Sequence, residues 1–282
     1  MKSILVATDF SNDAYCALFY GTKLFKETSC TFYILNVYDE LTPLKNKRAP
    51  FLSNKNELEE IEAQSNIALE KLIHKITLDT ENPNHKFIPL SIEGNLSKNI
   101  KNTTKVYDID LVLIGSKGET GAKELFFGSN TIQITNTISN CPILAIPKQI
   151  EYTAPKEIAF VTDYKQGCSL SNIAPLLFIA KQTNAAIRVM HIIEEASLDA
   201  EQELKYKLLK NCLKEYQHSF TTMKEFSDKA KVIHEFIAAR EIDLFCMVHQ
   251  KRNFLEKLLR EPVIKDVSMY ANIPFLILPS ME

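Results

Sequence analysis

The sequence predicts an α/β protein made of two tandem, doubly wound domains, each with a five-stranded parallel sheet. Short apolar, β-branched runs alternate with longer amphipathic segments, which is typical of a parallel sheet covered by helices. The opening strand and its turn occur twice, as Ile4-Leu-Val-Ala-Thr-Asp9-Phe and as Ile158-Ala-Phe-Val-Thr-Asp163-Tyr. With 282 residues, 45% of them hydrophobic, the chain can fill the cores of two such domains.

The elements of the first copy follow from these periodicities. Apolar runs such as Phe32-Tyr-Ile-Leu-Asn-Val37 predict strands, and amphipathic segments predict helices, two of which begin at the hydroxyl residues Ser11 and Ser129. In chain order we expect a strand over 2–8, a helix over 11–28, a strand over 31–37, a helix over 56–78, a strand over 86–91, a helix over 96–106, a strand over 110–115, a helix over 129–139 and a strand over 143–147. The second copy repeats this order from 157 to 279.

The two copies are expected to form domains 1–148 and 156–282, joined by a short polar linker with prolines near its ends. The runs Ile143-Leu-Ala-Ile146 and Phe275-Leu-Ile-Leu278 close the two copies and are apolar throughout. Left unpaired, each would be an exposed edge that invites aggregation. We therefore expect these last strands to pair with each other, so that the domains pack as a pseudo-twofold pair.

An insertion distinguishes the first copy from the second. Asp163 lies 154 residues after Asp9, whereas Asp243 lies 133 residues after Asp110, so the first copy is longer by about twenty residues. The insertion falls over 39–59. It either covers a site as a lid or is a solvated loop.

Composition excludes several classes of function. The formal net charge of -2 gives no basic field for nucleic acid, and no apolar run approaches the ~18 residues of a membrane span. The start of the chain lacks the pattern of a signal peptide, and the six cysteines are scattered without a C-x-x-C pair. We expect a cytoplasmic protein with free thiols, no nucleic-acid partner and no membrane partner.

Four of the seven glycines fall within fourteen residues, at Gly115, Gly118, Gly121 and Gly128. This loop follows an apolar strand and ends at Ser129, where a helix is expected to begin. Main-chain N–H groups at such a helix start can bind phosphate oxygens. The spacing G-x2-G-x9-G-S matches neither a Walker loop nor G-x-G-x-x-G. The loop either binds a phosphate or only shapes the connection between strand and helix, and we favour the phosphate.

These motifs together resemble the universal stress protein family in its tandem-domain form. The matching segments are Ile4-Leu-Val-Ala-Thr-Asp9-Phe-Ser11, Leu35-Asn-Val37, Asp110-Leu-Val-Leu-Ile-Gly115, the glycine loop and Cys141-Pro142. The resemblance implies domains of the adenine-nucleotide alpha hydrolase type and a site for ATP, alone or with Mg²⁺.

The resemblance also assigns roles to residues of the first copy. Asp9 is expected to contact the ribose, and Val37 the adenine by its backbone. The phosphates are expected at Gly115, Gly118, Gly128, Ser129 and Asn130. Four further residues, Ala7, Thr8, Ile114 and Thr131, are expected to line the site. From the residues alone, Asp9 could instead cap the following helix, although Ser11 could do so in its place.

The second copy lacks the glycine loop. Aligned on Asp243, it has Val248, Lys251, Glu261 and Pro262 where the first copy has Gly115, Gly118, Gly128 and Ser129. A shift by one residue would place His249, Arg252 and Pro262 at the three glycines instead, with the same consequence. These side chains fill the space for a phosphate, and Pro262 removes an N–H group. We expect one nucleotide per chain, bound by the first copy.

The function implied is that of a stress-response protein that acts through nucleotide-dependent conformation or partner binding. No convincing hydrolytic base accompanies the loop, and no catalytic or metal-binding residue is assigned. Slow ATP hydrolysis or self-phosphorylation at Ser129 or Thr131 stays open as an enzymatic alternative, and an interaction module without nucleotide stays open as another. The expected partners are an adenine nucleotide and a protein that the sequence does not identify, with a homodimer left open.

Overall fold

The computed structural model describes most of the chain, namely residues 1–39, 54–116, 129–147, 150–193, 197–224, 229–249 and 273–280. Much of the glycine loop, the 40–53 part of the insertion and the equivalent loop of the second copy therefore lie outside the described residues. We call residues 1–147 the first half, residues 150–155 the linker and residues 156–280 the second half.

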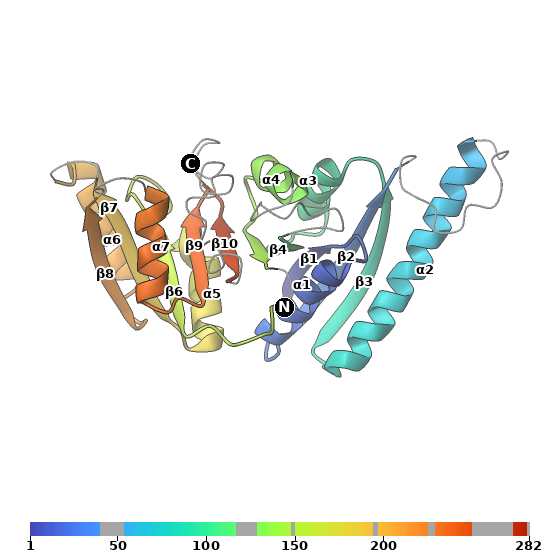
Figure 1. The fold of residues 1–282 in the computed structure, drawn as a ribbon, viewed down its shortest axis with the longest axis horizontal. Helices are drawn as coiled ribbons and strands as arrows, with labels where there is room; N and C mark the ends of the chain where they lie inside the picture. Colours follow the sequence, from blue (N-terminus) through green and yellow to red (C-terminus); the bar gives the residue numbers. More distant parts are fainter. Residues whose placement is uncertain are drawn as a thin grey trace.

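Strands and helices alternate in the first half in the order that the sequence predicts, and the second half repeats this order as far as β9 (Figure 1). The helix expected before the last strand of the second half lies outside the described residues. In the first half they are β1 (Lys2–Ala7), α1 (Asn12–Leu24), β2 (Cys30–Tyr38), α2 (Asn54–Thr80), β3 (His85–Glu93), α3 (Leu96–Val106), β4 (Leu111–Gly115), α4 (Ser129–Thr137) and β5 (Ile143–Ile146). In the second half they are β6 (Glu157–Val161), α5 (Leu170–Thr183), β7 (Ala186–Ile193), α6 (Ala200–Cys212), β8 (His218–Lys224), α7 (Lys229–Ala239), β9 (Leu244–Val248) and β10 (Phe275–Leu278).

Helix α1 ends earlier than the periodicity predicts, at Leu24 and not at residue 28. Phe25 caps it with non-helical dihedral angles and turns into the core, where its ring stacks on Phe178 of the second half with centroids 5.8 Å apart. The residue that follows α1 therefore packs between the halves and does not extend the helix.

All strands join one ten-stranded sheet, in the order β3-β2-β1-β4-β5-β10-β9-β6-β7-β8. Every neighbouring pair is parallel except β5 and β10, which are antiparallel. Figure 1 shows the two halves side by side, with α2 and β8 at opposite ends. The sequence-based expectation of two doubly wound, five-stranded halves joined through their last strands is confirmed.

The junction between the halves has approximate twofold symmetry. Leu144 pairs with Leu276, and these two residues hold equivalent places in the two halves. Ile143 pairs with Ile277 as Ala145 pairs with Phe275, which is the reciprocal pattern of a twofold contact. Phe275 is 5% exposed, and the other five residues of this pairing are at most 2% exposed. The pairing therefore hides the edges of both halves from solvent.

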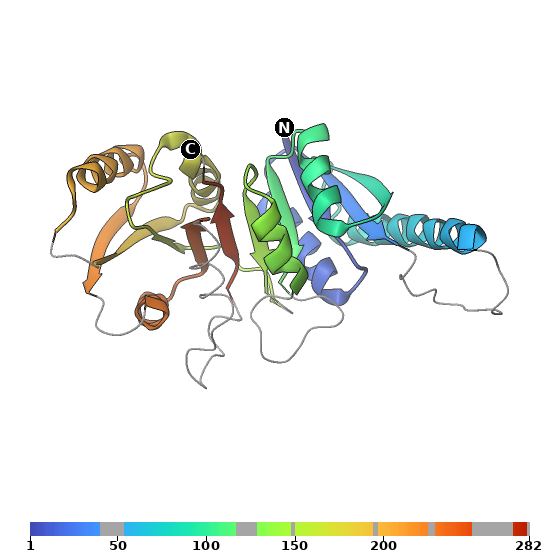
Figure 2. The ribbon, with the colours of Figure 1, turned by 90° about the horizontal axis from the view of Figure 1, so that it is seen from above.

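The sheet separates two cores, because side chains of a strand point alternately to its two faces. Ile4 and Val6 belong to the core covered by α1, α2, α5 and α6, whereas Leu5 belongs to the core covered by α3, α4 and α7. Both cores contain residues from both halves. Seen from above, α2 extends past the end of the sheet (Figure 2). No helix in the described part of the chain is long and apolar enough to cross a bilayer.

Candidate functional site

The candidate site lies at the carboxyl ends of β1, β2 and β4. Strand β1 lies between the other two, with Ala7 opposite Leu35 and Val6 opposite Leu113. After β1 the chain continues to β2 on one side and later returns to β4 on the other, so the strand order reverses here. In doubly wound sheets, ligands bind in the crevice outside the carboxyl ends of strands at this reversal.

The turn after β1 is held by three local hydrogen bonds. Thr8 N–H donates to the carbonyl oxygen of Leu35 (2.9 Å), Phe10 N–H to Thr8 Oγ1 (3.0 Å) and Ser11 N–H to Asp9 Oδ1 (3.0 Å). Phe10 has a φ of +63°, which is uncommon for a residue with a side chain. The turn leaves Asp9 exposed beyond the end of β1.

The two alternatives for the start of α1 are now resolved. Ser11 is the N-cap, and its side chain accepts a hydrogen bond from Ala14 N–H (3.2 Å). Asp9 braces the turn before the cap and does not cap the helix itself.

A buried chain of hydrogen bonds supports this turn from the neighbouring elements. Asn36 Nδ2 on β2 donates to the carbonyl oxygen of Thr8 (2.8 Å), and Asn36 Oδ1 accepts from Ser65 Oγ on α2 (2.8 Å). Ser91 Oγ on β3 donates in turn to Ser65 Oγ (2.7 Å). We call Asn36, Ser65 and Ser91 the polar relay. Sequence reasoning missed it, and the one signal was an asparagine inside an otherwise apolar strand.

Gly115 ends β4 where the strand meets the first turn of α1. A Cβ atom there would lie 3.1 Å from the carbonyl oxygen of Asp13 and 3.2 Å from its carbonyl carbon. Gly115 thus allows β4 to approach the main chain of α1 closely, and this contact is within the protein and not with a ligand. Gly118 and Gly128, the other two glycines assigned to the phosphates, lie outside the described residues.

Helix α4 begins beside Gly115. The Thr131 hydroxyl is buried and donates to the carbonyl oxygens of Gly115 (3.2 Å) or Ser116 (3.3 Å). Since a hydroxyl has one proton, this bond leaves Thr131 Oγ1 no donor for a ligand. The bond holds the start of α4 at the end of β4, and the main-chain N–H groups of the first turn remain the donors at this place.

The other predicted site residues differ in what they can offer a ligand. Ala7 and Val37 are half-buried, Thr8 is buried, and Asn130 on α4 is exposed. Ile114 is 3% exposed and packs into the core, so only its backbone can line a site. The structure places the described residues of the predicted site at or beside the carboxyl ends of β1, β2 and β4.

The second half repeats the turn. Thr162 N–H donates to the carbonyl oxygen of Met190 (3.0 Å), Tyr164 N–H to Thr162 Oγ1 (3.0 Å) and Lys165 N–H to Asp163 Oδ1 (2.8 Å). Tyr164 has a φ of +56°, close to that of Phe10. The duplicated motif therefore encodes the same strained turn in both halves.

The strand register also fixes Val248 as the counterpart of Gly115. A glycine also permits the contact at the end of β9, but it lies in the turn before α5 and not on the strand. Gly167, at the position of Asp13, has a φ of +68°, and a Cβ atom there would lie 2.1 Å from Cγ2 of Val248. The valine side chain thus fills the space at the end of β9.

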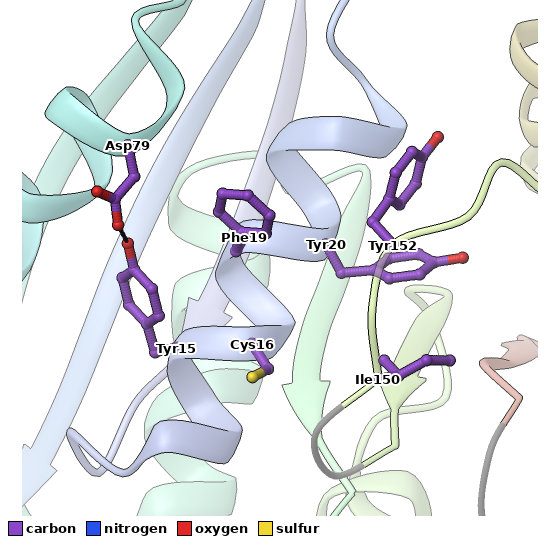
Figure 3. A pocket seen from close by; sticks show the side chains of 7 residues that line it. All are labelled: Tyr15, Cys16, Phe19, Tyr20, Asp79, Ile150 and Tyr152. Carbon is purple, nitrogen blue, oxygen red and sulfur yellow. Dashed lines mark hydrogen bonds between the residues drawn. The ribbon is translucent and has the colours of Figure 1, made fainter.

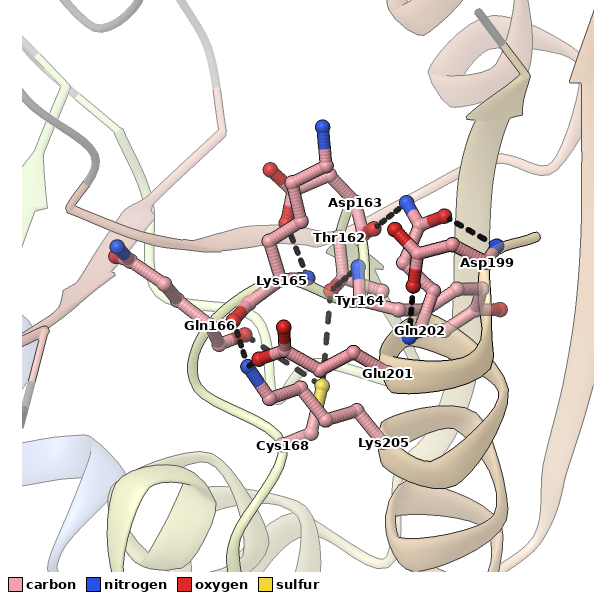
Figure 4. Close-up of polar contacts among 10 residues, drawn as sticks. All are labelled: Thr162, Asp163, Tyr164, Lys165, Gln166, Cys168, Asp199, Glu201, Gln202 and Lys205. Carbon is pink, nitrogen blue, oxygen red and sulfur yellow. Dashed lines mark hydrogen bonds and ion pairs between the residues drawn. The ribbon is translucent and has the colours of Figure 1, made fainter. Parts of the chain in front are cut away.

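Side chains of the second half also cover its turn, as Figure 4 shows. Gln202 Nε2 on α6 donates to the carbonyl oxygen of Asp163 (2.9 Å), and Lys205 Nζ donates to that of Lys165 and pairs with Glu201 (2.6 Å). Asp199 and Gln202 form a reciprocal capping box that fixes the start of α6.

Histidine replaces the polar relay in the second half. His191, the counterpart of Asn36, is buried, and its Nδ1 lies 3.0 Å from the carbonyl oxygen of Thr162. Because a carbonyl only accepts, this nitrogen carries the proton. The imidazole stacks on Tyr164 with centroids 4.6 Å apart. The strand ends of the second half are thus filled by protein side chains.

Burial keeps two titratable groups near these strand ends, His249 and Cys168, uncharged at neutral pH. Burial lowers the pKa of His249, which follows β9, below its ordinary value of 6.5, so the imidazole offers no positive charge at neutral pH. Burial raises the pKa of Cys168 to about 11. All six cysteines are free, and no group of three or more potential metal ligands occurs within the described ranges.

A duplicated, doubly wound α/β protein whose two halves differ at the carboxyl ends of their strands is the class that this geometry defines. The sequence model of the universal stress protein family matches residues 1–147 and 173–279, and the chain belongs to that family.

Two solved structures share the fold over the whole chain. A universal stress protein from Archaeoglobus fulgidus DSM 4304 superposes with a TM-score of 0.69 at 14% identity, covering 99% of this chain and 97% of the other. A functionally unknown protein from Pseudomonas aeruginosa PAO1 superposes with a TM-score of 0.58 at 13% identity, covering 99% and 93%. A search of curated protein sequences gave no significant match.

Proposed function

We propose that the first half binds an adenine nucleotide, in the first place ATP, at the carboxyl ends of β1, β2 and β4. The observation that carries this proposal is the contrast between the two halves at the reversal of strand order. In the first half, Asp9 is exposed beyond the end of β1, and the start of α4 lies against Gly115 at the end of β4. In the second half, Val248 and residues of α6 occupy the corresponding space.

The proposed roles follow the family resemblance and the chemistry of the edge. The exposed Asp9 carboxylate accepts hydrogen bonds from ribose hydroxyls, and the backbone of Val37 pairs with the adenine. The phosphates lie at the start of α4, where main-chain N–H groups and the helix dipole favour negative charge. Because the Thr131 hydroxyl is engaged with β4, we assign the phosphate contact of Thr131 to its main-chain N–H group.

The nucleotide acts in this proposal as a signal and not as a rapidly consumed substrate. The polar relay links the turn that bears Asp9 to α2 and β3, so occupancy of the site can be read by those elements. The second half scaffolds the first through the shared sheet. The six free thiols suit the reducing cytoplasm, where we place the protein.

A matched pair of variants tests the site. Asp9→Asn and Asp163→Asn make the same change at equivalent turns. In each variant the amide oxygen can still accept the hydrogen bond from the main-chain N–H of Ser11 or Lys165. We expect Asp9→Asn to weaken ATP binding about tenfold in calorimetry and Asp163→Asn to leave it unchanged. Equal effects of the two variants would refute the assignment to the first half.

Two further measurements complete this test. The purified protein, heated and extracted, is expected to release an adenine nucleotide, and Gly118→Val is expected to abolish ATP binding while the circular dichroism spectrum stays the same. If no nucleotide is released and ATP does not bind, the interaction module without nucleotide is the correct alternative.

A further inference from the structure

A hollow lies where α1, the end of α2 and the linker between the halves meet. Its volume is about 410 Å³, within the range of small-molecule sites. None of the predicted nucleotide-site residues lines it. Figure 3 shows the lining side chains, which are Tyr15, Cys16, Phe19, Tyr20, Asp79, Ile150 and Tyr152, and we call this hollow the aromatic cavity.

Aromatic rings form most of its wall, and they are held in place by packing. Tyr20 is 2% exposed and meets Tyr152 of the linker edge to face, with centroids 5.0 Å apart. Tyr15 and Phe19, from the same helix, are half-buried. A wall of fixed rings offers apolar contact and negative ring faces without a large ordering cost.

The charge of the cavity comes from Asp79. It is the only charged residue among the seven, and the lining includes no basic side chain. The Tyr15 hydroxyl donates to Asp79 Oδ2, which fixes the carboxylate at the rim beside the rings (Figure 3). A carboxylate next to aromatic faces attracts cations and repels anions.

The protein itself already places a cation on one of these rings. Lys75 Nζ lies 3.8 Å from the ring centroid of Tyr15. The contact is a cation–π interaction between an alkylammonium group and a ring of the cavity wall. An amine of a ligand can make the same kind of contact with the other rings.

We propose that the aromatic cavity binds small organic cations, with an ammonium group beside Asp79 and an apolar or aromatic body against Phe19, Tyr20 and Tyr152. Asp79 selects the sign of the charge, and the rings select an organic ion over a hydrated metal ion. The site is independent of the proposed nucleotide. Because Ile150 and Tyr152 belong to the linker, an occupant touches the connection between the two halves.

The thiol of Cys16 makes the proposal testable, since it lines the cavity and is free. In a Cys212→Ser background, which removes the other half-buried cysteine, the reaction of Cys16 with a neutral aromatic disulfide reports occupancy. The probes are benzyltrimethylammonium, benzyl alcohol and benzoate, which share a ring and differ in charge. We expect the cation to slow the reaction at least threefold and the other two to have little effect.

Variants then test the role of the carboxylate. Asp79→Asn is expected to weaken protection by the cation about tenfold, and Asp79→Glu to retain it. Glu70→Gln removes an exposed charge from the same helix outside the cavity and is expected to change nothing. Each variant is also measured without a ligand. If Cys16 then reacts at the same rate as in the parent protein, the variant keeps the cavity.

The outcomes separate the proposal from its alternatives. Protection by the cation alone, lost in Asp79→Asn and kept in Asp79→Glu, supports it. Equal protection by benzyl alcohol or benzoate indicates an apolar hollow without charge selection and overturns it. Absence of protection by any probe, or protection by the cation that survives Asp79→Asn, overturns it as well.

Discussion

Asn36 is a single polar residue whose two side-chain groups are both used within the protein. Its amide nitrogen holds the carbonyl oxygen of Thr8, and its amide oxygen accepts from Ser65. Both partners are buried, so neither finds water if the asparagine is removed. A buried polar group without a partner costs about 1–3 kcal/mol.

The variant Asn36→Ala is therefore expected to lower the free energy of unfolding by about 1–3 kcal/mol. Denaturant unfolding followed by circular dichroism measures this loss. Thr77→Ala, which removes an exposed hydroxyl bonded within α2, is the control and is expected to change stability by less than about 0.5 kcal/mol. Equal stability of the Asn36 variant and the parent would show that the relay does not support the turn.

Individual residues show which features of the site could be predicted from the sequence and which could not. The recurrence of Thr-Asp-aromatic predicted a duplicated turn, and the structure has it at Phe10 and Tyr164. The packing of Gly115 against Asp13 and of Val248 against Gly167 could not be predicted, because each contact joins segments about one hundred or eighty residues apart. The assignment of ATP to this edge remains a prediction from the resemblance.

At the scale of elements, β5 and β10 decide how the halves are held together. Both strands are short and apolar, and their pairing is the one antiparallel step among the described strands. Their need for a partner was readable from the sequence, since each closes a copy and neither carries the charges that protect an edge. Leu276 lies at the center of the junction and is fully buried.

Leu276→Ala is expected to lower the free energy of unfolding by about 2–5 kcal/mol, because it leaves a cavity opposite Leu144. Leu204→Ala makes the same chemical change on α6, where the side chain is 68% exposed, and is expected to cost less than about 0.5 kcal/mol. Thermal unfolding of the two variants measures the difference. Similar losses would mean that the junction contributes little.

The start of β3 gives the protein a dependence on pH. Burial lowers the pKa of His85 below its ordinary value of 6.5, although a hydrogen bond to the carbonyl oxygen of Phe25 (3.1 Å) opposes the shift. Above 6.5 the imidazole is neutral in both the folded and the unfolded chain. As the pH falls through 6.5 the unfolded chain takes up the proton first, so stability is lost.

His85→Gln is accordingly expected to reduce the fall in unfolding temperature between pH 7.5 and pH 5. His249 shifts in the same direction, so part of the dependence remains. His74→Gln, at an exposed position of α2, is the control and is expected to keep the full dependence. If His85→Gln follows the same curve as the control, His85 is not a source of the dependence.

In the whole molecule, the two halves have the same fold but different residues at the carboxyl ends of their strands. The two halves share strand order, the strained turn and a twofold junction. They differ at the strand ends, where the first half has Gly115 beside α4 and the second has Val248, His191 and contacts from α6. Duplication thus supplies a common scaffold whose two copies carry different residues at the carboxyl ends of their strands.

The number of ATP molecules bound per chain tests this account most directly. Isothermal titration calorimetry of the full chain is expected to give one site, and Asp9→Asn is expected to weaken that site while Asp163→Asn does not. A stoichiometry of two would contradict the account, because the second half would then bind a nucleotide despite its filled strand ends.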